Sequence, residues 1–282
     1  MLARLDVAVD GDRVVGLSAS PPLAAKVLAG IHGPELLLVG AAASLVEGDE
    51  LAVSLRLGPG ARLTVRTAAA TLAHPCPGAG STTFDVHADL GPGASLAWLP
   101  EPLVACAGCR HGGRARVRLA AGAAAVWSET LVLGRWGERP GDVAVRLDVD
   151  LAGTPLLRDG LRAGPSAPAW DGPAVLDGTR HLGSVALLGL RPRAGPVQRR
   201  TVLALAGEGA LVRAAGSDAA SVERRLAPWR SAFVADLATV VPAGGDGFAD
   251  GRNGSGNGHR PATPASCEGN APSLRFGASP KG

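Results

Sequence analysis

The densest group of potential metal ligands in the sequence consists of cysteine and histidine. Cys106 and Cys109 form a C-x-x-C pair, and His111 follows two residues later. Two thiolates and an imidazole are soft donors that suit zinc, nickel or copper(I). His74 and Cys76, in the stretch His-Pro-Cys, would add two more donors if the loops after two strands converged. The pattern therefore indicates a candidate metal site formed by these five residues.

Other features of the sequence weigh against a metal or redox function for this cluster. A closed zinc site needs a second ligand pair at matching spacing, which the His-Pro-Cys stretch does not supply. A redox C-x-x-C pair is expected at a strand-to-helix turn in a βαβ setting, which is absent around residues 106–109. Free cysteine also packs well as a small apolar side chain. A zinc-binding or redox-active protein that uses Cys106, Cys109 and His111 remains an alternative hypothesis.

One carboxylate, Glu101, is held between two prolines. Pro100 and Pro102 fix their φ angles and remove two backbone donors, so this segment is not an ordinary central strand. The stretch is predicted to be a rigid strand breaker that presents the Glu101 carboxylate.

A second carboxylate, Glu129, lies in the apolar stretch "VWSETLVLG", two residues after Trp127. This position predicts a buried side chain, and a buried carboxylate needs a partner, such as Arg135. Most such carboxylates hold strands together and bind no ligand, and both interpretations stay open here.

Motifs of the common enzyme classes are missing. The sequence has no G-x-x-x-x-G-K-[ST] phosphate loop, no G-x-S-x-G elbow and no H-E-x-x-H pair. No G-x-G-x-x-G follows a predicted strand and opens a helix. We therefore expect a protein that is not an enzyme.

Composition and charge narrow the classes of partner. The 282 residues are 46% hydrophobic but only 3% aromatic, so small aliphatic side chains must fill the core. The formal charge of +3 comes from arginines that are dispersed along the chain, without the basic stripe that tracks a phosphate backbone. No signal peptide and no run of about 18 apolar residues is visible. We expect a cytoplasmic protein without nucleic-acid or membrane partners and without disulfides.

The dominant periodicity is that of β-strands. In residues 143–151 the side chains alternate between apolar and polar, and the same alternation recurs at 5–9, 53–57, 84–90 and 114–119. Such alternation favours antiparallel sheet. The fold class expected is mainly β, with layered antiparallel or mixed sheets in a sandwich or β-helix-like body.

An internal echo accompanies these strands. The stretches "LGPGARL" at 57–63, "LGPGASL" at 90–96 and "LAAGAAA" at 119–125 each place a leucine three residues before a glycine, with a new strand following. They indicate stacked strand–turn–strand units. Alternatively, they are ordinary turns in a chain with 40 Gly and 22 Pro.

A small helical part is expected late in the chain. Residues 217–237 begin with a capping candidate, Ser217 or Asp218, and place apolar residues along one face. Pro228 predicts either two short helices or one kinked helix, and residues 21–30 are a second helix candidate. We expect one β-rich domain over residues 1–242. Residues 243–282 form a Gly/Pro-rich segment that is expected to be disordered.

The order of several short pieces resembles the urease accessory proteins of the UreD family, also called UreH. These pieces are "LVEGDEL" at 45–51, "LGPGARLTVRTAAATLAHP" at 57–75, "GASLAWLPEPLV" at 93–104, "WSETLVLGRWGERPGD" at 127–142 and "LLRDGL" at 156–161. The resemblance spans about residues 30 to 165. This chain departs from the family pattern at "GAAASLVEGD", where paired glycines are usual, and at Arg66-Thr67-Ala68, where Thr-Thr-Gln is usual. It resembles a divergent member.

The resemblance implies a scaffold without catalytic activity. UreD-like proteins bind apo-urease and UreF, and through UreF the GTPase UreG, and help to deliver nickel to the urease active site. No tightly bound cofactor is implied, only transient nickel. The candidate nickel route consists of Glu101, Glu129 and Asp49. The remaining motif residues are assigned to structure or partner binding: Gly48, Gly60, Thr67, Thr71, Pro100, Pro102, Gly134, Arg135, Gly137 and Glu138. The other alternative, a β-sandwich module for a small ligand, is disfavoured by the scarcity of aromatic residues.

Overall fold

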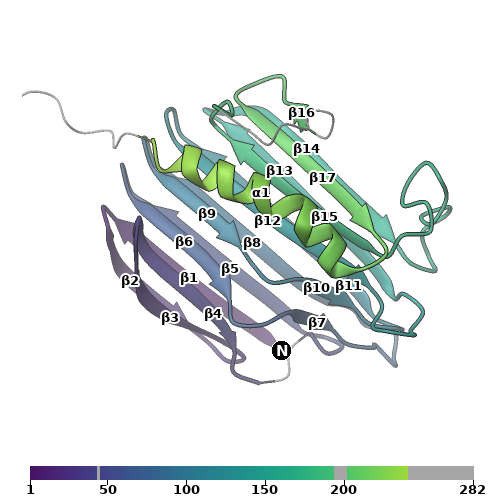
Figure 1. Ribbon diagram of the computed structural model, residues 1–282. Helices are drawn as coiled ribbons and strands as arrows, with labels where there is room; N and C mark the ends of the chain where they lie inside the picture. Colours follow the sequence, from purple (N-terminus) through teal and green to yellow (C-terminus); the bar gives the residue numbers. More distant parts are fainter. Residues whose placement is uncertain (43–44, 194–201, 241–282) are drawn as a thin grey trace, which may run out of the picture. The chain divides into compact units, whose positions relative to one another are not determined.

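The computed structural model describes residues 1–42, 45–193 and 202–240. Over these residues the protein is built of two β-sheets stacked face to face, with one α-helix on the outer face of one sheet (Figure 1). The mainly β, layered fold class with a small late helical part is therefore confirmed. The predicted segment 243–282 and the end of the predicted domain at 242 lie outside the described residues.

The first layer is a seven-stranded sheet in the order β14-β13-β11-β8-β5-β1-β2. Its strands are β1 (Leu2–Asp10), β2 (Arg13–Ala19), β5 (Glu50–Leu57), β8 (Thr82–Leu90), β11 (Arg110–Leu119), β13 (Asp142–Leu151) and β14 (Thr154–Ala163).

The second layer is a ten-stranded sheet whose main order is β16-β17-β15-β12-β9-β6-β4-β3. Two short strands lie off this path, with β10 pairing to both β12 and β7. The strands are β3 (Leu23–Gly30), β4 (Gly33–Gly40), β6 (Arg62–Thr67), β7 (Thr71–Ala73), β9 (Ser95–Leu99), β10 (Leu103–Ala105), β12 (Ala124–Leu133), β15 (His181–Leu188), β16 (Val202–Ala204) and β17 (Gly209–Gly216).

The chain winds between the two layers like a solenoid. It passes from β5 to β6, from β8 to β9 and from β11 to β12, so that successive strands of one layer run in the same direction. In the seven-stranded layer β5, β8, β11 and β13 pair in parallel, and in the other layer β4, β6, β9 and β12 do so. The antiparallel pairing favoured by the alternation occurs in β1–β2, β13–β14, β3–β4, β12–β15, β15–β17 and β16–β17. Alternation reports directly which face of a strand is buried, and it does not fix the direction of the neighbouring strand.

The three echoes in the sequence are the three turns that carry the chain from one layer to the other. Leu57, Leu90 and Leu119 are register partners at the ends of β5, β8 and β11. Gly60, Gly93 and Gly122 have φ angles of 67°, 66° and 73°, a region that favours glycine. The turns also bond to one another, as in Gly60 N to Pro92 O at 2.8 Å and Ala124 N to Ala94 O at 2.9 Å. The echo is therefore a structural repeat.

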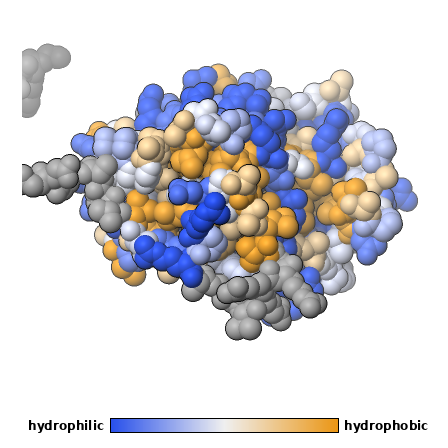
Figure 2. Space-filling model, turned by 90° about the horizontal axis from the view of Figure 1, so that it is seen from above, coloured by the Kyte–Doolittle hydropathy of each residue, from blue (hydrophilic) through white to orange (hydrophobic). Residues whose placement is uncertain are grey.

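The main core lies between the two sheets and consists largely of leucine, valine and alanine. Its one aromatic stack is formed by Trp98 on β9 and Trp127 on β12, with ring centroids 5.0 Å apart and an interplanar angle of 12°. Several apolar side chains also reach the surface, and Figure 2 shows apolar patches separated by polar residues on one face. Such a mixture is usual for a folded protein.

The helix α1 (Ala219–Leu237) covers the outer face of the ten-stranded sheet and forms a second core with it. Asp218 caps its first turn, because its Oδ1 accepts a hydrogen bond from Ser221 N at 2.7 Å. Pro228 lies inside this helix, so of the two predicted alternatives, two short helices or one kinked helix, the structure has a single helix. Proline costs about 3 kcal/mol inside a helix. Burial of large apolar side chains, each contributing about 1.5–3 kcal/mol, offsets that cost. These side chains include Val222, Leu226 and Phe233.

The second predicted helix, at residues 21–30, is wrong. Residues Leu23–Gly30 form β3, which is joined to β4 as an antiparallel hairpin. Pairing of the two strands along their whole length outweighs the local helical pattern. None of the helices in residues 1–42, 45–193 and 202–240 combines the length and apolar character needed to cross a membrane.

Candidate functional site

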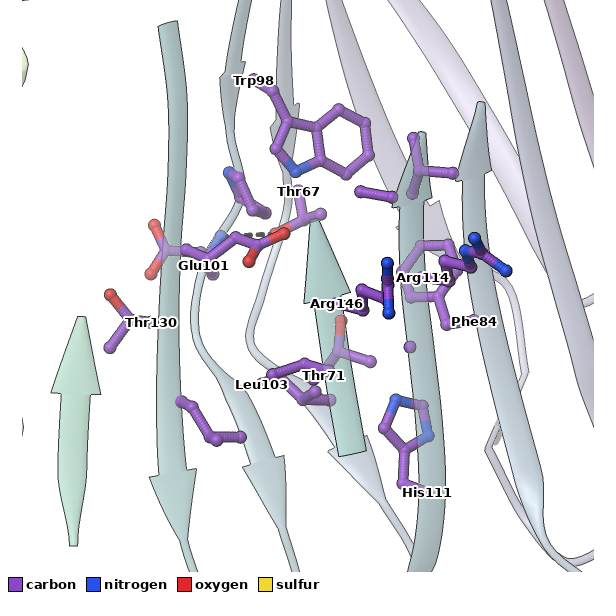
Figure 3. Close-up of a pocket in the computed structure, with 17 residues that line it drawn as sticks. Thr67, Thr71, Phe84, Trp98, Glu101, Leu103, His111, Arg114, Thr130 and Arg146 are labelled. Carbon is purple, nitrogen blue, oxygen red and sulfur yellow. Dashed lines mark hydrogen bonds between the residues drawn. The ribbon is translucent and has the colours of Figure 1, made fainter. Parts of the chain in front are cut away.

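A cavity of about 110 Å³ lies between the two sheets, near the end where β7 and β10 extend the ten-stranded layer. Strands β8, β11 and β13 form one wall, and β6, β7, β9, β10 and β12 form the other (Figure 3). Most of the lining is apolar. The polar side chains that line it include Thr67, Thr71, Glu101, His111, Glu129 and Thr130.

Glu101 lies at the exposed side of this cavity, in the break between β9 and β10. Its backbone N–H donates to Thr67 Oγ1 at 2.9 Å, the bond drawn in Figure 3. Pro102 O accepts a hydrogen bond from Thr71 N at 2.9 Å. The Pro-Glu-Pro stretch is thus not part of a strand, as predicted, and two threonines hold it in place.

Glu129 lies deeper, on the face of β12 that points between the sheets. Trp127, two residues earlier on the same face, donates from Nε1 to Glu129 Oε1 at 2.7 Å. Protein atoms surround the carboxyl group, while part of the side chain remains open to the cavity. Burial, and to a smaller extent the charge of Asp159, raise the pKa of Glu129. The Glu129 carboxyl group therefore holds its proton more tightly than an exposed glutamate does.

The partner predicted for Glu129 from the sequence was wrong. Arg135 donates from Nε to Glu138 Oε1 at 2.8 Å. The arginine whose charge acts on Glu129, lowering its pKa slightly against the larger effect of burial, is Arg213. Trp127 supplies the hydrogen bond instead. The long-range pairing that brings β17 with Arg213 near β12 leaves no local signal in the sequence.

A smaller cavity of about 50 Å³ lies next to the first one, toward β14, β15 and β17. The two cavities share Glu129, Leu131, Val145 and Arg146 as lining residues. At the far side of the smaller cavity Arg213 forms an ion pair with Asp159. Glu129 is therefore the acidic residue common to both cavities.

Arg146 and Arg114, which also line the first cavity, both pair with one carboxylate, that of Asp148. Arg146 Nε donates to Asp148 Oδ1 and Arg114 NH2 to Asp148 Oδ2, both at 2.8 Å. In Figure 3 Arg114 lies across the cavity from Glu101. Among the described residues, neither arginine forms an ion pair with Glu101 or Glu129.

The third predicted carboxylate, Asp49, is in another place. It is 3% exposed and does not line either cavity. Its Oδ2 accepts from Val46 N at 3.2 Å, and its Oδ1 accepts from the amino group of Met1 at 2.9 Å. Gly48, with φ of 84°, lies in the turn between Val46 and Asp49. The side chain thus closes the loop before β5.

His111 reaches the first cavity from β11 and is 4% exposed. Its Nδ1 lies 2.9 Å from Thr82 Oγ1, and its Nε2 has no hydrogen-bond partner among the described residues. Burial lowers the pKa of His111 to about 4. The imidazole is therefore neutral at physiological pH.

The three cysteines lie near one another but are packed as apolar side chains. Cys76, Cys106 and Cys109 are buried, and Cys109 Sγ contacts Asp142 O at 3.6 Å. Burial raises the pKa of Cys106, and that of Cys109 to about 12, so both are thiols at neutral pH. Within the described ranges, no three His, Cys, Asp or Glu side chains are placed to hold a metal ion. The geometry lends no support to a zinc or redox centre at this cluster.

Arg135 and Glu138 form the base of a tight turn between β12 and β13. Gly134 and Gly137 have φ angles of 83° and 75°, in the region that favours glycine. The hydrogen bond from Arg135, more than any other effect, lowers the pKa of Glu138 to about 2. The motif "GRWGE" is thus a folded turn held by an ion pair.

Comparison with known proteins places this chain in one family. The family described as "UreD urease accessory protein" matches residues 3–242. The chain belongs to the UreD family of urease accessory proteins. A UreD of Parafrankia sp. (strain EAN1pec) is 38% identical over 271 residues, which cover 86% of this chain and 91% of that protein. A protein named urease accessory protein UreD 3, from Streptomyces griseus subsp. griseus, is 40% identical over 74% of this chain and 86% of its own length.

Membership of the UreD family supports an accessory role in urease maturation. It also agrees with the resemblance in the order of the motifs. The family match covers residues 3–242, which is more of the chain than the motifs at about residues 30–165. In this UreD protein, the sequence predicted Glu101 and Glu129 as candidate route residues, and the structure places both on one cavity. Thr130, Arg146, Asp159 and Arg213, which also line the two cavities, were not predicted. Asp159 falls in the motif stretch "LLRDGL" and Thr130 in "WSETLVLGRWGERPGD", whereas Arg146 and Arg213 lie in none of the motif stretches.

Proposed function

We propose that this UreD protein is a scaffold without catalytic activity that binds apo-urease and UreF, and through UreF the GTPase UreG. In this proposal Ni²⁺ is cargo that passes along the two adjacent cavities toward the urease active site. The assembly works in the cytoplasm, as the sequence analysis predicts. Family membership supports the maturation role, and the cavities support the route.

The observation that carries the proposed route is the position of Glu129 at the border of both cavities. Carboxylate oxygen is a hard donor that binds a hydrated divalent cation. The raised pKa means that a proton competes with the cation for this oxygen. A ligand of this kind binds Ni²⁺ transiently and releases it, as transfer requires.

Glu101 complements Glu129 at the exposed side of the larger cavity. Its carboxylate lies on a segment whose backbone is fixed by two prolines and by the bond to Thr67. A fixed carboxylate at an opening attracts cations from solution and raises their local concentration. We assign Glu101 to capture of the ion and Glu129 to its passage.

The described residues provide few ligands at each point along this path, and no three of the acidic, cysteine and histidine side chains among them converge on one position. Such spacing suits an ion that keeps much of its water shell while it moves. His111 offers one neutral nitrogen to the same cavity. Asp49 was predicted as a third carboxylate of the route, but it lines neither cavity. We propose that it supports the structure, since its oxygens close the loop before β5.

The proposed function is tested by reconstitution. The tagged wild-type chain is incubated with purified apo-urease and UreF, captured, and analysed for bound proteins. The captured complex is then supplied with UreG, GTP, bicarbonate and Ni²⁺, and urea hydrolysis is measured. We expect both proteins to be retained and urease activity to appear. Retention of neither protein by a folded chain would contradict the proposal.

A further inference from the structure

Trp136 is the most exposed large apolar side chain among the described residues, with a relative exposure of 102%. It lies in the turn between β12 and β13. The other four tryptophans differ: Trp98, Trp127 and Trp229 are buried, and Trp170 is half-buried. Full exposure of an indole to water is unfavourable, because burial of its large apolar surface would lower the free energy.

Hydrogen bonds fix the backbone of the turn that carries this side chain. Glu138 N donates to Arg135 O at 3.0 Å, which closes a four-residue turn with Trp136 and Gly137 at its centre. Gly137 has φ of 75°, as the third residue of a type II turn requires. Glu138 Oε2 also accepts from Arg135 N at 3.1 Å. Trp136 is thus presented by a closed turn.

The turn is also tied to neighbouring segments. Gly134 N donates to Ala105 O at 2.8 Å, which joins the turn to β10, and Ala107 N donates to Glu138 Oε2 at 3.3 Å. Arg180, before β15, donates to the backbone oxygen of Glu138. The turn therefore lies at the end of the sheet where β7 and β10 are seen in Figure 1. Bonds to these two neighbouring segments mean that the backbone of the turn has little conformational entropy to lose on binding.

The charges beside Trp136 are mainly positive. Arg135, Arg139 and Arg180 are exposed, and Glu138 is the single acid of the turn. Glu138 is already paired with Arg135. A partner surface that meets this turn is therefore favoured when it carries carboxylates around the point of contact.

We propose that Trp136 anchors a docking site for a protein partner that has an apolar pocket with an acidic rim. The proposal rests on the proposed function, because it takes the partner from the urease maturation assembly. Tryptophan and arginine are enriched among the residues that dominate binding free energy in protein interfaces. A rigid turn with one indole at its tip fits a pocket better than it fits a flat surface. The motif "GRWGE" then serves both to hold the turn and to present its anchor.

The experiment measures the affinity of the full chain for apo-urease and for UreF separately, by biolayer interferometry. The variants are Trp136→Ala, Trp136→Phe and, as a matched control, Ile31→Ala. Ile31 is 95% exposed and lies between β3 and β4, in another part of the sheet. Each variant is first checked for an unchanged thermal unfolding transition.

We expect Trp136→Ala to raise the Kd for one of the two proteins at least tenfold and Trp136→Phe to raise it less. Ile31→Ala should change it less than twofold. Quenching of wild-type tryptophan fluorescence by acrylamide should fall when that partner is bound, and this decrease should be absent from Trp136→Ala. Wild-type affinity of Trp136→Ala for both proteins would overturn the docking site and leave the proposed function intact. A wild-type chain that bound neither protein would overturn both.

Discussion

Trp127 Nε1 and Glu129 Oε1 lie 2.7 Å apart on the inward face of β12. The same Trp127 ring stacks on Trp98, so an aromatic pair in the core fixes the donor that holds the carboxyl group. Because Glu129 also borders both cavities, the core and the proposed route meet at one residue. Changes at Glu129 are therefore expected to affect stability and nickel transfer in different directions.

Glu129→Gln is expected to stabilise the fold at pH 7. The folded-state pKa of Glu129 is raised by burial, so ionisation costs free energy above the unfolded pKa near 4.5, and an amide avoids that cost. The amide oxygen still accepts from Trp127. We expect a gain on the order of 1 kcal/mol. Urea unfolding at pH 7 and pH 4 measures it. The gain should shrink at pH 4, and an equal gain at both values would contradict the assignment.

His111 is expected to make stability fall in mild acid. Its folded pKa of about 4 lies below the ordinary 6.5, so between these values the unfolded chain binds the additional proton. The contribution of His111 to the free energy of unfolding should be fully present above pH 6.5 and should decrease toward pH 4 by at most about 3 kcal/mol. His111→Gln, which retains a partner for Thr82, should remove that part of the pH dependence. The same slope in both proteins would contradict this account.

Gly183 is expected to be intolerant of a methyl group because α1 packs directly on it. A Cβ at this position would lie 2.4 Å from Leu226 Cδ1 and 2.8 Å from Val222 Cγ1. Gly183→Ala should therefore lower the free energy of unfolding by about 1–3 kcal/mol. Gly112→Ala is the control, since its Cβ would meet no atom closer than 4.0 Å. Similar costs for both variants would show that α1 does not sit against β15 at this point.

The cysteines are expected to be inert in the folded protein. In a Cys267→Ser background, Cys76, Cys106 and Cys109 should react with iodoacetamide at pH 8 many times more slowly than after unfolding in urea. The reason is burial, which also raises the pKa of Cys106 and Cys109 and keeps them as thiols. Rates are read by mass spectrometry. Rapid labelling of Cys106 or Cys109 in the native state would revive the redox alternative.

Much of the fold was predictable because strand alternation and turn chemistry are local. The leucines and glycines at 57–63, 90–96 and 119–125 marked the turns of the solenoid, since each turn repeats the same backbone requirement. Strand direction was not predictable, because it depends on how far each segment travels before it returns to its layer. Residues 21–30 were misread as helix for a related reason, since their partner strand determines their conformation.

The site was predictable only in part. The prolines around Glu101 gave a local signal, and the apolar setting of Glu129 predicted its burial. The sequence predicted Arg135 as the partner of Glu129 because an ion pair was expected. In the structure Trp127, two residues earlier on the same face of β12, donates the hydrogen bond. Asp159 and Arg213 reach the second cavity through pairings of β14 and β17 that no short segment encodes.

The most direct test of the central claim compares complex formation with urease activation for changes at the two cavity carboxylates. Glu129→Ala, Glu129→Gln and Glu101→Ala are assayed beside Glu223→Ala, a surface control on α1. We predict that all four variants capture apo-urease and UreF like the wild type. Activation by Ni²⁺ should slow at least several-fold in the Glu129 and Glu101 variants and stay unchanged in Glu223→Ala. Wild-type activation rates in both Glu129 variants and in Glu101→Ala would contradict the nickel route.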